Sequence, residues 1–259
     1  MMPIRDALPG AGALAVLQRN FGVWRKLLAP SLLGNFGDPL LYLLALGYGL
    51  GHFVGRMDGM PYITFIASGI VASSVMNTAS FEGLYSAFTR MSAQRTYAAM
   101  LATPLRVSDI LAGEVLWCAV KGLISAVAIV IVASFFGAIQ GPWVLLALPV
   151  ILLAGLSFGG LALVMTALAR SYDFFMYYFT LAVTPMFLFC GVFYPLHSLP
   201  PFAQQLAQVL PLTHAVALLR PLLTGHLPHE MLYHAGVLLL YTLVAYGFAW
   251  RLLSRRLLR

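Results

Sequence analysis

Apolar residues in this chain form long, nearly uninterrupted runs instead of the alternating or striped patterns of soluble domains. Six runs reach the length of roughly 20 residues that an α-helix needs to cross a bilayer. They cover residues 31–54, 61–85, 110–139, 143–169, 174–193 and 231–253. Hydrocarbon offers no water to the backbone, so each N–H and C=O group must pair within its own helix. The pattern predicts an all-α integral membrane protein with six transmembrane helices.

The composition agrees with this prediction and argues against a soluble catalytic domain. Hydrophobic residues make up 61% of the 259 residues and charged residues only 9%, whereas a soluble domain carries roughly 25% charged residues. No repeat, low-complexity tract or linker divides the chain, so we expect residues 1–259 to form a single transmembrane domain. Gln18 and Arg19 soon interrupt the first apolar stretch, and we expect no signal peptide.

The positive charges are distributed unequally between the two sides that the predicted spans define. One side carries Arg5, Arg19, Arg25, Lys26, Arg90, Arg95, Arg106, Arg170, Arg251, Arg255, Arg256 and Arg259, and the other carries Arg56 and Arg220. Loops rich in Lys and Arg resist translocation and mark the cytoplasmic face. We therefore expect both termini in the cytoplasm.

Lys121 belongs to neither side, because it lies within the predicted third span, directly before an unbroken apolar run. Its long stem could carry the ammonium group back to the cytoplasmic headgroups. Alternatively, it could pair with Glu114, which lies seven residues earlier on nearly the same helical face. The sequence leaves both interpretations open.

Residues 14–28 predict an amphipathic helix that lies on the membrane surface. Leu14, Leu17, Phe21, Trp24 and Leu28 recur at helical spacing, and the polar positions between them carry charge. This helix could anchor the first span or admit substrate from the inner leaflet. At 38–39 an Asp-Pro pair disfavours helix and marks a turn into the first span.

Polar and aromatic side chains mark a candidate substrate path through the second and fifth spans. Ser73 and Asn77 lie four residues apart and therefore share one helix face. Tyr177 and Tyr178 supply rings that could stack on sugar faces. The other interpretation is structural, with hydrogen bonds between packed helices and aromatic anchors at the membrane interface.

The longest cytoplasmic connection, residues 85–106, predicts a short amphipathic helix that could bind a partner. Its apolar positions include Phe88, Met91 and Tyr97. The helix should end before Thr103, because Pro104 disfavours helical geometry in the preceding residue. Thr103 and Pro104 then suit the N-cap and first position of the next helix.

Prolines break the apolar sequence after the fifth span into pieces too short to cross a bilayer. Pro195, Pro200 and Pro211 separate these pieces, and His214 follows the last proline. Broken backbone at membrane depth is tolerated where protein or a wet cavity covers it. We expect a re-entrant hairpin over residues 195–214 on the external side.

Motifs for chemistry within the chain are missing from the sequence. No Gly-rich phosphate loop ends in Gly-Lys-Ser or Gly-Lys-Thr, so ATP would have to bind another chain. His226, His229 and His234 lack a metal-ligand pattern, and no nucleophile elbow is present. Cys118 and Cys190 lie in separate apolar segments as expected of buried thiols. We therefore expect that this chain holds no metal ion and no cofactor and that it is not an enzyme.

The order of these features resembles the permeases of the ABC-2 exporter family, and among them those that export lipo-oligosaccharides. The resemblance covers essentially the whole chain. It is carried by Gly-Tyr-Gly-Leu-Gly at 47–51, Gln-Arg-Thr-Tyr at 94–97, Met-Leu-Ala-Thr-Pro-Leu at 100–105, Asp-Ile-Leu-Ala-Gly-Glu at 109–114, Gly-Val-Phe-Tyr-Pro at 191–195 and Leu-Pro-Leu-Thr-His-Ala-Val at 210–216. Each string is weakly specific alone, and their order is strongly specific.

The resemblance implies a homodimer in the bacterial inner membrane that binds two copies of a separate ABC ATPase, which holds ATP and Mg. It implies that the cytoplasmic helix after the second span docks on the ATPase, with Arg90, Arg95 and Tyr97 as contacts. It also implies that the hairpin forms an outer gate. The expected cargo is a lipo-oligosaccharide or another amphipathic saccharide. An alternative is an ABC-2 exporter of a hydrophobic drug or peptide. A further alternative is that the protein is an ion-coupled carrier.

Overall fold

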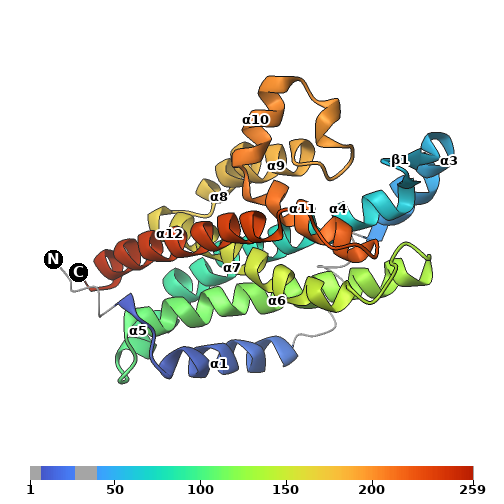
Figure 1. Ribbon diagram of the computed structural model, residues 1–259. Coiled ribbons are helices and arrows are strands. Elements are labelled where there is room, and N and C mark those ends of the chain that lie inside the picture. The colour runs from blue at the N-terminus through green and yellow to red at the C-terminus, as the bar shows by residue number, and fades with distance from the viewer. Residues whose placement is uncertain (1–6, 27–39, 259) are drawn as a thin grey trace.

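The computed structural model describes residues 7–26 and 40–258, and nearly all of its regular structure is helical (Figure 1). The helices are α1 (Gly12–Lys26), α3 (Gly51–Val54), α4 (Tyr62–Phe81), α5 (Thr96–Leu101), α6 (Val107–Phe135), α7 (Val144–Leu168), α8 (Asp173–Tyr178), α9 (Thr184–Phe189), α10 (Pro201–Val209), α11 (Pro211–Leu223) and α12 (Met231–Leu257). The other helical segments are short. The π-helical ones are η2 (Ala45–Leu50), η3 (Glu82–Ser86), η4 (Thr89–Ala93) and η5 (Phe179–Val183), and η6 (Leu196–Ser198) is a 3₁₀ turn. Strands β1 (Arg56–Met57) and β2 (Met60–Pro61) form one antiparallel hairpin.

Within the described residues, four helices are long and apolar enough to cross a membrane: Tyr62–Ala93, Val107–Phe135, Val144–Leu168 and Met231–Leu257. They coincide with the predicted second, third, fourth and sixth spans. Shorter apolar helices, Leu40–Val54 and Asp173–Phe189, occupy the positions of the first and fifth. The beginning of the predicted first span, with the Asp-Pro pair at 38–39, lies outside the described residues. The all-α membrane class is confirmed.

Helix α4 lies at the centre of the bundle, in contact with α6, α7 and α11. Small residues let α6 and α7 approach each other closely: a Cβ added at Gly155 would lie 2.7 Å from Ala119 Cα, and one at Gly159 would lie 2.6 Å from Cys118 Cβ. Bilayer helices gain their association energy from such packing, because lipid tails are as apolar as the helices. The α4, α6 and α7 helices therefore form a tightly packed frame.

Helix α1 forms as predicted and packs against α6. It runs lengthwise beside the first turns of α6, where Val16 packs on Gly113 and Trp24 contacts Trp117 (Figure 1). The buried face is Ala13, Val16 and Asn20. The sequence predicted the amphipathic stripe but not this contact with α6, because such a stripe fits a protein groove as well as a headgroup layer.

A methyl group at Gly113 is expected to push α1 away from α6. Its Cβ would lie 2.5 Å from Val16 Cβ and 2.8 Å from the Ala13 carbonyl oxygen, and such overpacking costs roughly 1–3 kcal/mol. Gly236→Ala in α12 is the control, since its Cβ would meet nothing within 4 Å. Thermal unfolding in detergent should show a lower midpoint for Gly113→Ala and an equal or higher one for Gly236→Ala. Equal midpoints would contradict the close α1–α6 contact.

The second span continues further than the sequence indicated. Helix runs through η3 and η4 to Ala93, so Phe88 and Met91 belong to the span helix and are buried there. Arg95 then adopts a left-handed conformation (φ 51°) that turns the chain into α5, which ends at Leu101, before Thr103 as predicted. The predicted cytoplasmic helix is therefore this short α5 at the tip of a longer span.

The next helix does not begin at Thr103 and Pro104. The Thr103 hydroxyl donates to the Met100 carbonyl at 2.6 Å, and α6 begins at Val107. Asp109 caps α6 by accepting hydrogen bonds from the backbone N–H groups of Arg106 (3.0 Å) and Gly10 (2.6 Å). This shared carboxylate joins the segment before α1 to the start of α6.

The prolines of the predicted hairpin stand where their missing amide hydrogen has no cost. Pro195 precedes η6, Pro200 precedes α10, and Pro211 is the first residue of α11. Helices α10 and α11 meet at 89°. The second arm extends beyond His214 to Leu223 and is largely buried, so the hairpin is asymmetric: α10 projects from the bundle and α11 packs within it (Figure 1).

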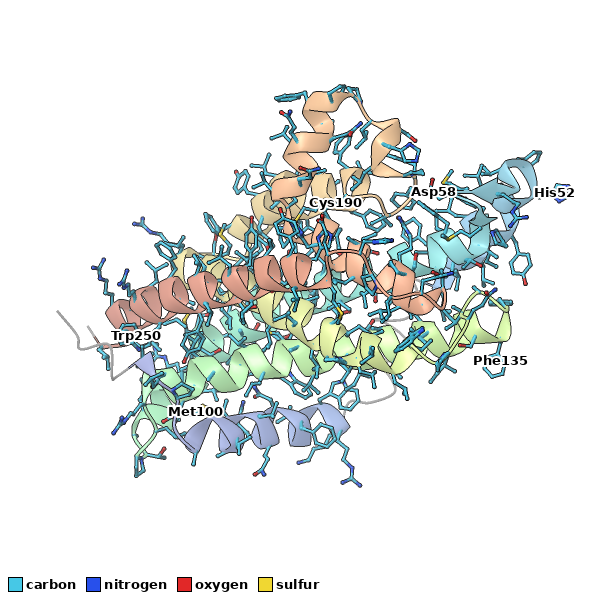
Figure 2. The ribbon with its side chains drawn as sticks, viewed as in Figure 1. His52, Asp58, Met100, Phe135, Cys190 and Trp250 are labelled. Atoms are coloured by element: carbon cyan, nitrogen blue, oxygen red, sulfur yellow. The ribbon has the colours of Figure 1, made fainter. Side chains whose placement is uncertain are left out.

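The two ends of the bundle differ in the segments they present. Figure 2 shows Met100 and Trp250 toward one end, and His52, Asp58 and Phe135 toward the other, with Cys190 beneath the projecting hairpin. The starts of α1 and α6 and the end of α12 share the first end (Figure 1). We refer to this as the tip end, because it carries the corner at Arg95 and α5.

Candidate functional site

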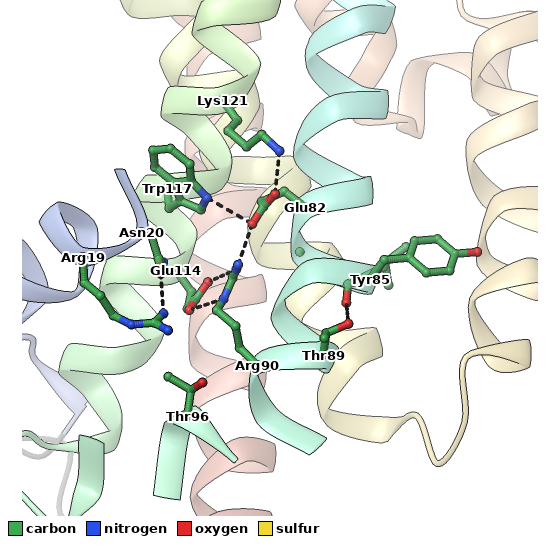
Figure 3. Close-up of polar contacts among 12 residues, drawn as sticks. Arg19, Asn20, Glu82, Tyr85, Thr89, Arg90, Thr96, Glu114, Trp117 and Lys121 are labelled. Atoms are coloured by element: carbon green, nitrogen blue, oxygen red, sulfur yellow. Dashed lines mark hydrogen bonds and ion pairs between the residues drawn. The ribbon is translucent and has the colours of Figure 1, made fainter. Parts of the chain in front are cut away.

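Two buried carboxylates and two cations form a connected network between the end of the second span and α6 (Figure 3). Glu82 and Glu114 are 2% and 1% exposed. Arg90 donates to Glu114 through Nε (3.0 Å) and Nη2 (2.5 Å), and its Nη1 lies 2.9 Å from Glu82 Oε1. Lys121 Nζ donates to Glu82 Oε2 at 2.7 Å, and Trp117 Nε1 donates to Oε1 at 3.0 Å.

Local helix geometry places these side chains together. Glu114, Trp117 and Lys121 recur at intervals of three and four residues, so they share one face of α6. Glu82 and Arg90 lie on the π-helical segments η3 and η4, which interrupt the regular α-helix of the second span. π-Helical turns occur frequently at functional sites because they redirect side chains and free carbonyl groups. Thr166 of α7 donates to one such carbonyl, that of Gly83, at 2.6 Å.

The network lies deep along the helices. At about 1.5 Å per residue, Glu114 is roughly 10 Å and Lys121 roughly 21 Å from the start of α6 at Val107. Charged groups at this depth are costly unless paired, and in membrane proteins they usually mark functional positions. Each charge here meets an opposite charge, so the four groups together are neutral.

The structure gives Lys121 a partner that the sequence did not name. Lys121 does not pair with Glu114: it bonds to Glu82, while Glu114 bonds to Arg90. The sequence signal for Glu82 was available, because a carboxylate in an apolar span requires a cation within reach. Sequence could not name that cation, which is 39 residues away.

A cavity of about 320 Å³ opens beside the network, between α1, the end of the second span and α6. Its walls include side chains from all three. They are Arg19, Asn20, Val23, Trp24, Glu82, Tyr85, Ser86, Thr89, Arg90, Gln94, Trp117 and Lys121. Polar and aromatic groups predominate, and Glu114 lies outside the wall, behind Arg90. The cavity depends on the lengthwise position of α1, which the sequence did not predict.

The three side chains predicted to contact an ATPase occupy different environments. Arg95 is exposed at the corner before α5. Tyr97 is 1% exposed, and burial raises the pKa of its hydroxyl well above the usual range. Arg90 is held by the two carboxylates, with its side chain 12% exposed. Within one chain, only Arg95 is free to touch a partner directly, and Arg90 and Tyr97 connect its corner to the core.

The structure does not bring the predicted substrate-path residues to this cavity. Ser73 is buried and donates to the Ile70 carbonyl of its own helix at 3.1 Å, and Asn77 is half-buried. Tyr177 is 60% exposed whereas Tyr178 is 8% exposed, so the two rings do not share one environment. These contacts suit packing and surface exposure, and the path through them stays a prediction.

His214 connects the hairpin to the last helix. Its Nδ1 lies 2.8 Å from Nδ1 of His234 on α12, and its Nε2 lies 2.8 Å from the carbonyl oxygen of Gln208. His234 is therefore engaged in a pair with His214. Among the described residues no group of three or more His, Cys, Asp or Glu side chains could hold a metal ion.

Comparisons with known proteins agree over nearly the whole length. Residues 13–224 match the family model described as ABC-2 type transporter. The chain is 45% identical over 255 residues to nodulation protein J of Rhizobium leguminosarum bv. trifolii, covering 98% of this chain and 97% of that protein. It is 42% identical over 254 residues to nodulation protein J of Rhizobium meliloti (strain 1021), covering 97% of each. It is 28% identical over 240 residues to the inner membrane transport permease YadH of Escherichia coli (strain K12), covering 92% of this chain and 91% of that protein.

Proposed function

This chain belongs to the ABC-2 type transporter family, and from that premise we propose that it is the permease subunit of an ATP-driven exporter of a lipo-oligosaccharide or a similar amphipathic saccharide. The similarity to nodulation protein J over 98% of the chain supports this cargo class most strongly. The sequence contains no phosphate-binding loop, so ATP and Mg belong to a partner. We propose two copies of an ABC ATPase that resembles nodulation protein I, bound to a homodimer of this chain.

The proposed topology has six spans in the bacterial inner membrane, with both termini and the tip end in the cytoplasm. The four helices of spanning length support it directly. The shorter helices Leu40–Val54 and Asp173–Phe189 would supply the first and fifth spans. The projecting α10 would then lie on the outer side, where Pro195, Pro200, Pro211 and His214 would form the gate region.

The buried network suggests how movement of the ATPase reaches the membrane. The exposed corner at Arg95 follows η4 directly, and Arg90 of η4 is fastened to Glu114 of α6 and to Glu82. A force on the corner would therefore move the second and third spans together. This arrangement would convert closure of the ATPase dimer into rearrangement of the spans that enclose the export path.

The test of the cargo class is transport by the purified permease with its ATPase in lipid vesicles. Acylated oligosaccharides, simple lipids and hydrophobic drugs or peptides are supplied in parallel. ATP-dependent transport of acylated oligosaccharides alone is the expected result. Transport of drugs or peptides alone would reassign the cargo, and transport driven by an ion gradient without ATP would reject the proposal.

Arg95→Glu is expected to weaken co-purification of the ATPase roughly tenfold, since charge reversal at an exposed contact opposes association. Tyr97→Phe should leave binding unchanged, because that hydroxyl is buried. Arg170→Glu is the matched control, an exposed arginine in the loop before α8. Equal losses for Arg95→Glu and Arg170→Glu would contradict docking at the Arg95 corner. Quantitative pull-down at fixed salt measures all three.

A further inference from the structure

Two hydrogen-bond donors in the wall of the cavity have no acceptor among the described residues. They are Asn20 Nδ2 and Trp24 Nε1, both fully buried atoms. Asn20 is only 3% exposed, and its Oδ1 already accepts a hydrogen bond from Arg19 at 2.9 Å. Its side-chain amino group is therefore the part that lacks a partner among the described residues. Buried donors are nearly always paired in proteins, and leaving one unpaired is costly. Both donors are therefore available to an acceptor from outside the described residues.

The charges of the wall also favour an acceptor. Arg19, Arg90 and Lys121 face a single carboxylate there, that of Glu82. Both Glu82 oxygens already accept bonds, from Arg90, Trp117 and Lys121. Arg90 is further neutralised by Glu114 from outside the wall, and Arg19 has no carboxylate within ion-pair distance among the described residues. The wall thus presents excess positive charge and spare N–H groups.

We propose that this cavity binds a phosphate-type oxyanion, carried on the headgroup of a membrane amphiphile. An oxyanion only accepts hydrogen bonds and carries negative charge, which matches Arg19, Asn20 and Trp24. A neutral saccharide would bring hydroxyl donors that this wall does not need. Arg19 also provides the planar guanidinium group that suits phosphate oxygens.

The surroundings favour a source within the bilayer. Leu14 (58% exposed) and Phe21 (45% exposed) share one face of α1, so the helix beside the cavity presents apolar side chains at its surface. The α6 residues of the cavity wall, Trp117 and Lys121, lie about 15 and 21 Å along a helix of spanning length. A headgroup could occupy the cavity while its acyl chains remain on the apolar surface. This site goes beyond the proposed export function, because it requires neither the ATPase nor a particular cargo.

Binding to the purified full-length chain in dodecyl maltoside micelles tests the proposal, since the detergent already supplies a neutral sugar in excess. Native mass spectrometry would compare phosphatidylglycerol, phosphatidylcholine and inorganic phosphate. Phosphatidylglycerol should bind more tightly than phosphatidylcholine. Arg19→Gln and Asn20→Leu should each weaken that binding roughly tenfold, the effect of losing a charge-assisted or buried hydrogen bond. Inorganic phosphate distinguishes the source: weak binding supports an anchored headgroup, and equal binding supports the oxyanion site with a soluble ligand.

Arg25→Gln is the matched control, because it removes the same charge from the exposed part of α1 outside the cavity. It should change the affinity for phosphatidylglycerol less than twofold. Equal losses for Arg19→Gln and Arg25→Gln would mean that α1 attracts anionic lipid only through its general charge, and would overturn the site. Equal affinity for phosphatidylglycerol and phosphatidylcholine, together with no binding of inorganic phosphate, would overturn the site as well. Either failure leaves the ATP-driven transport assay unaffected.

Discussion

Arg90→Ala is expected to destabilise the folded permease by about 3–5 kcal/mol, the usual cost of removing one partner from a buried ion pair. The substitution removes the bonds of 3.0 and 2.5 Å to Glu114 and the contact of 2.9 Å to Glu82. Glu82 keeps Lys121 and Trp117, but Glu114 loses the cation that it pairs with. Most of the cost therefore falls on an isolated carboxylate that is 1% exposed.

A second substitution separates charge from packing. In Arg90→Ala with Glu114→Gln, the isolated charge disappears, so the double variant should be more stable than Arg90→Ala alone. Arg95→Ala is the control, since Arg95 is exposed five residues further on and should shift stability by less than about 0.5 kcal/mol. Denaturant titration in mixed micelles measures the series. A stability of Arg90→Ala equal to that of Arg95→Ala would show that the network does not hold the tip to α6.

Arg220→Met is expected to release the turn beneath the projecting hairpin. Arg220 donates from Nη2 to the Gly191 carbonyl at 2.6 Å and from Nε to Ser68 Oγ at 3.0 Å, and its guanidinium carbon lies 3.6 Å above the Phe65 ring. It thereby joins α11, the turn at Gly191 and α4. Loss of two charge-assisted bonds and a desolvated cation–π contact costs roughly 3 kcal/mol. Methionine retains much of the apolar stem but none of the donors.

Cys190 reports this release, because it is 0% exposed and adjacent to Gly191. In a Cys118→Ser background, maleimide labelling of Cys190 should accelerate roughly a hundredfold in Arg220→Met if labelling follows local opening. Arg56→Met serves as the control: Arg56 is exposed and, in the described part of the chain, bonds only within its own hairpin, to the Gly59 carbonyl. A labelling rate in Arg220→Met that matches Arg56→Met would contradict the role of Arg220 as the clamp.

The family assignment was available from the sequence, since the strings that carry the resemblance are short and local. The substrate-path residues were a weaker prediction. Ser73 and Tyr178 were chosen for their chemistry, but chemistry alone does not say whether a hydroxyl faces a cavity or its own helix. The cavity instead involves Asn20, Trp24 and Trp117, which in the sequence are indistinguishable from ordinary residues of amphipathic and apolar helices.

The sequence by itself determined where the long helices lie, because satisfying the backbone in hydrocarbon is a local requirement that each segment meets alone. The predicted fourth span, 143–169, differs from α7 by one residue at each end. Only the tertiary structure decided which charges meet and where α1 lies. Glu114 and Lys121 share a helix face, yet each bonds to the second span instead. Such pairings depend on the register between α4 and α6, which packing contacts such as that of Gly122 with Val75 fix.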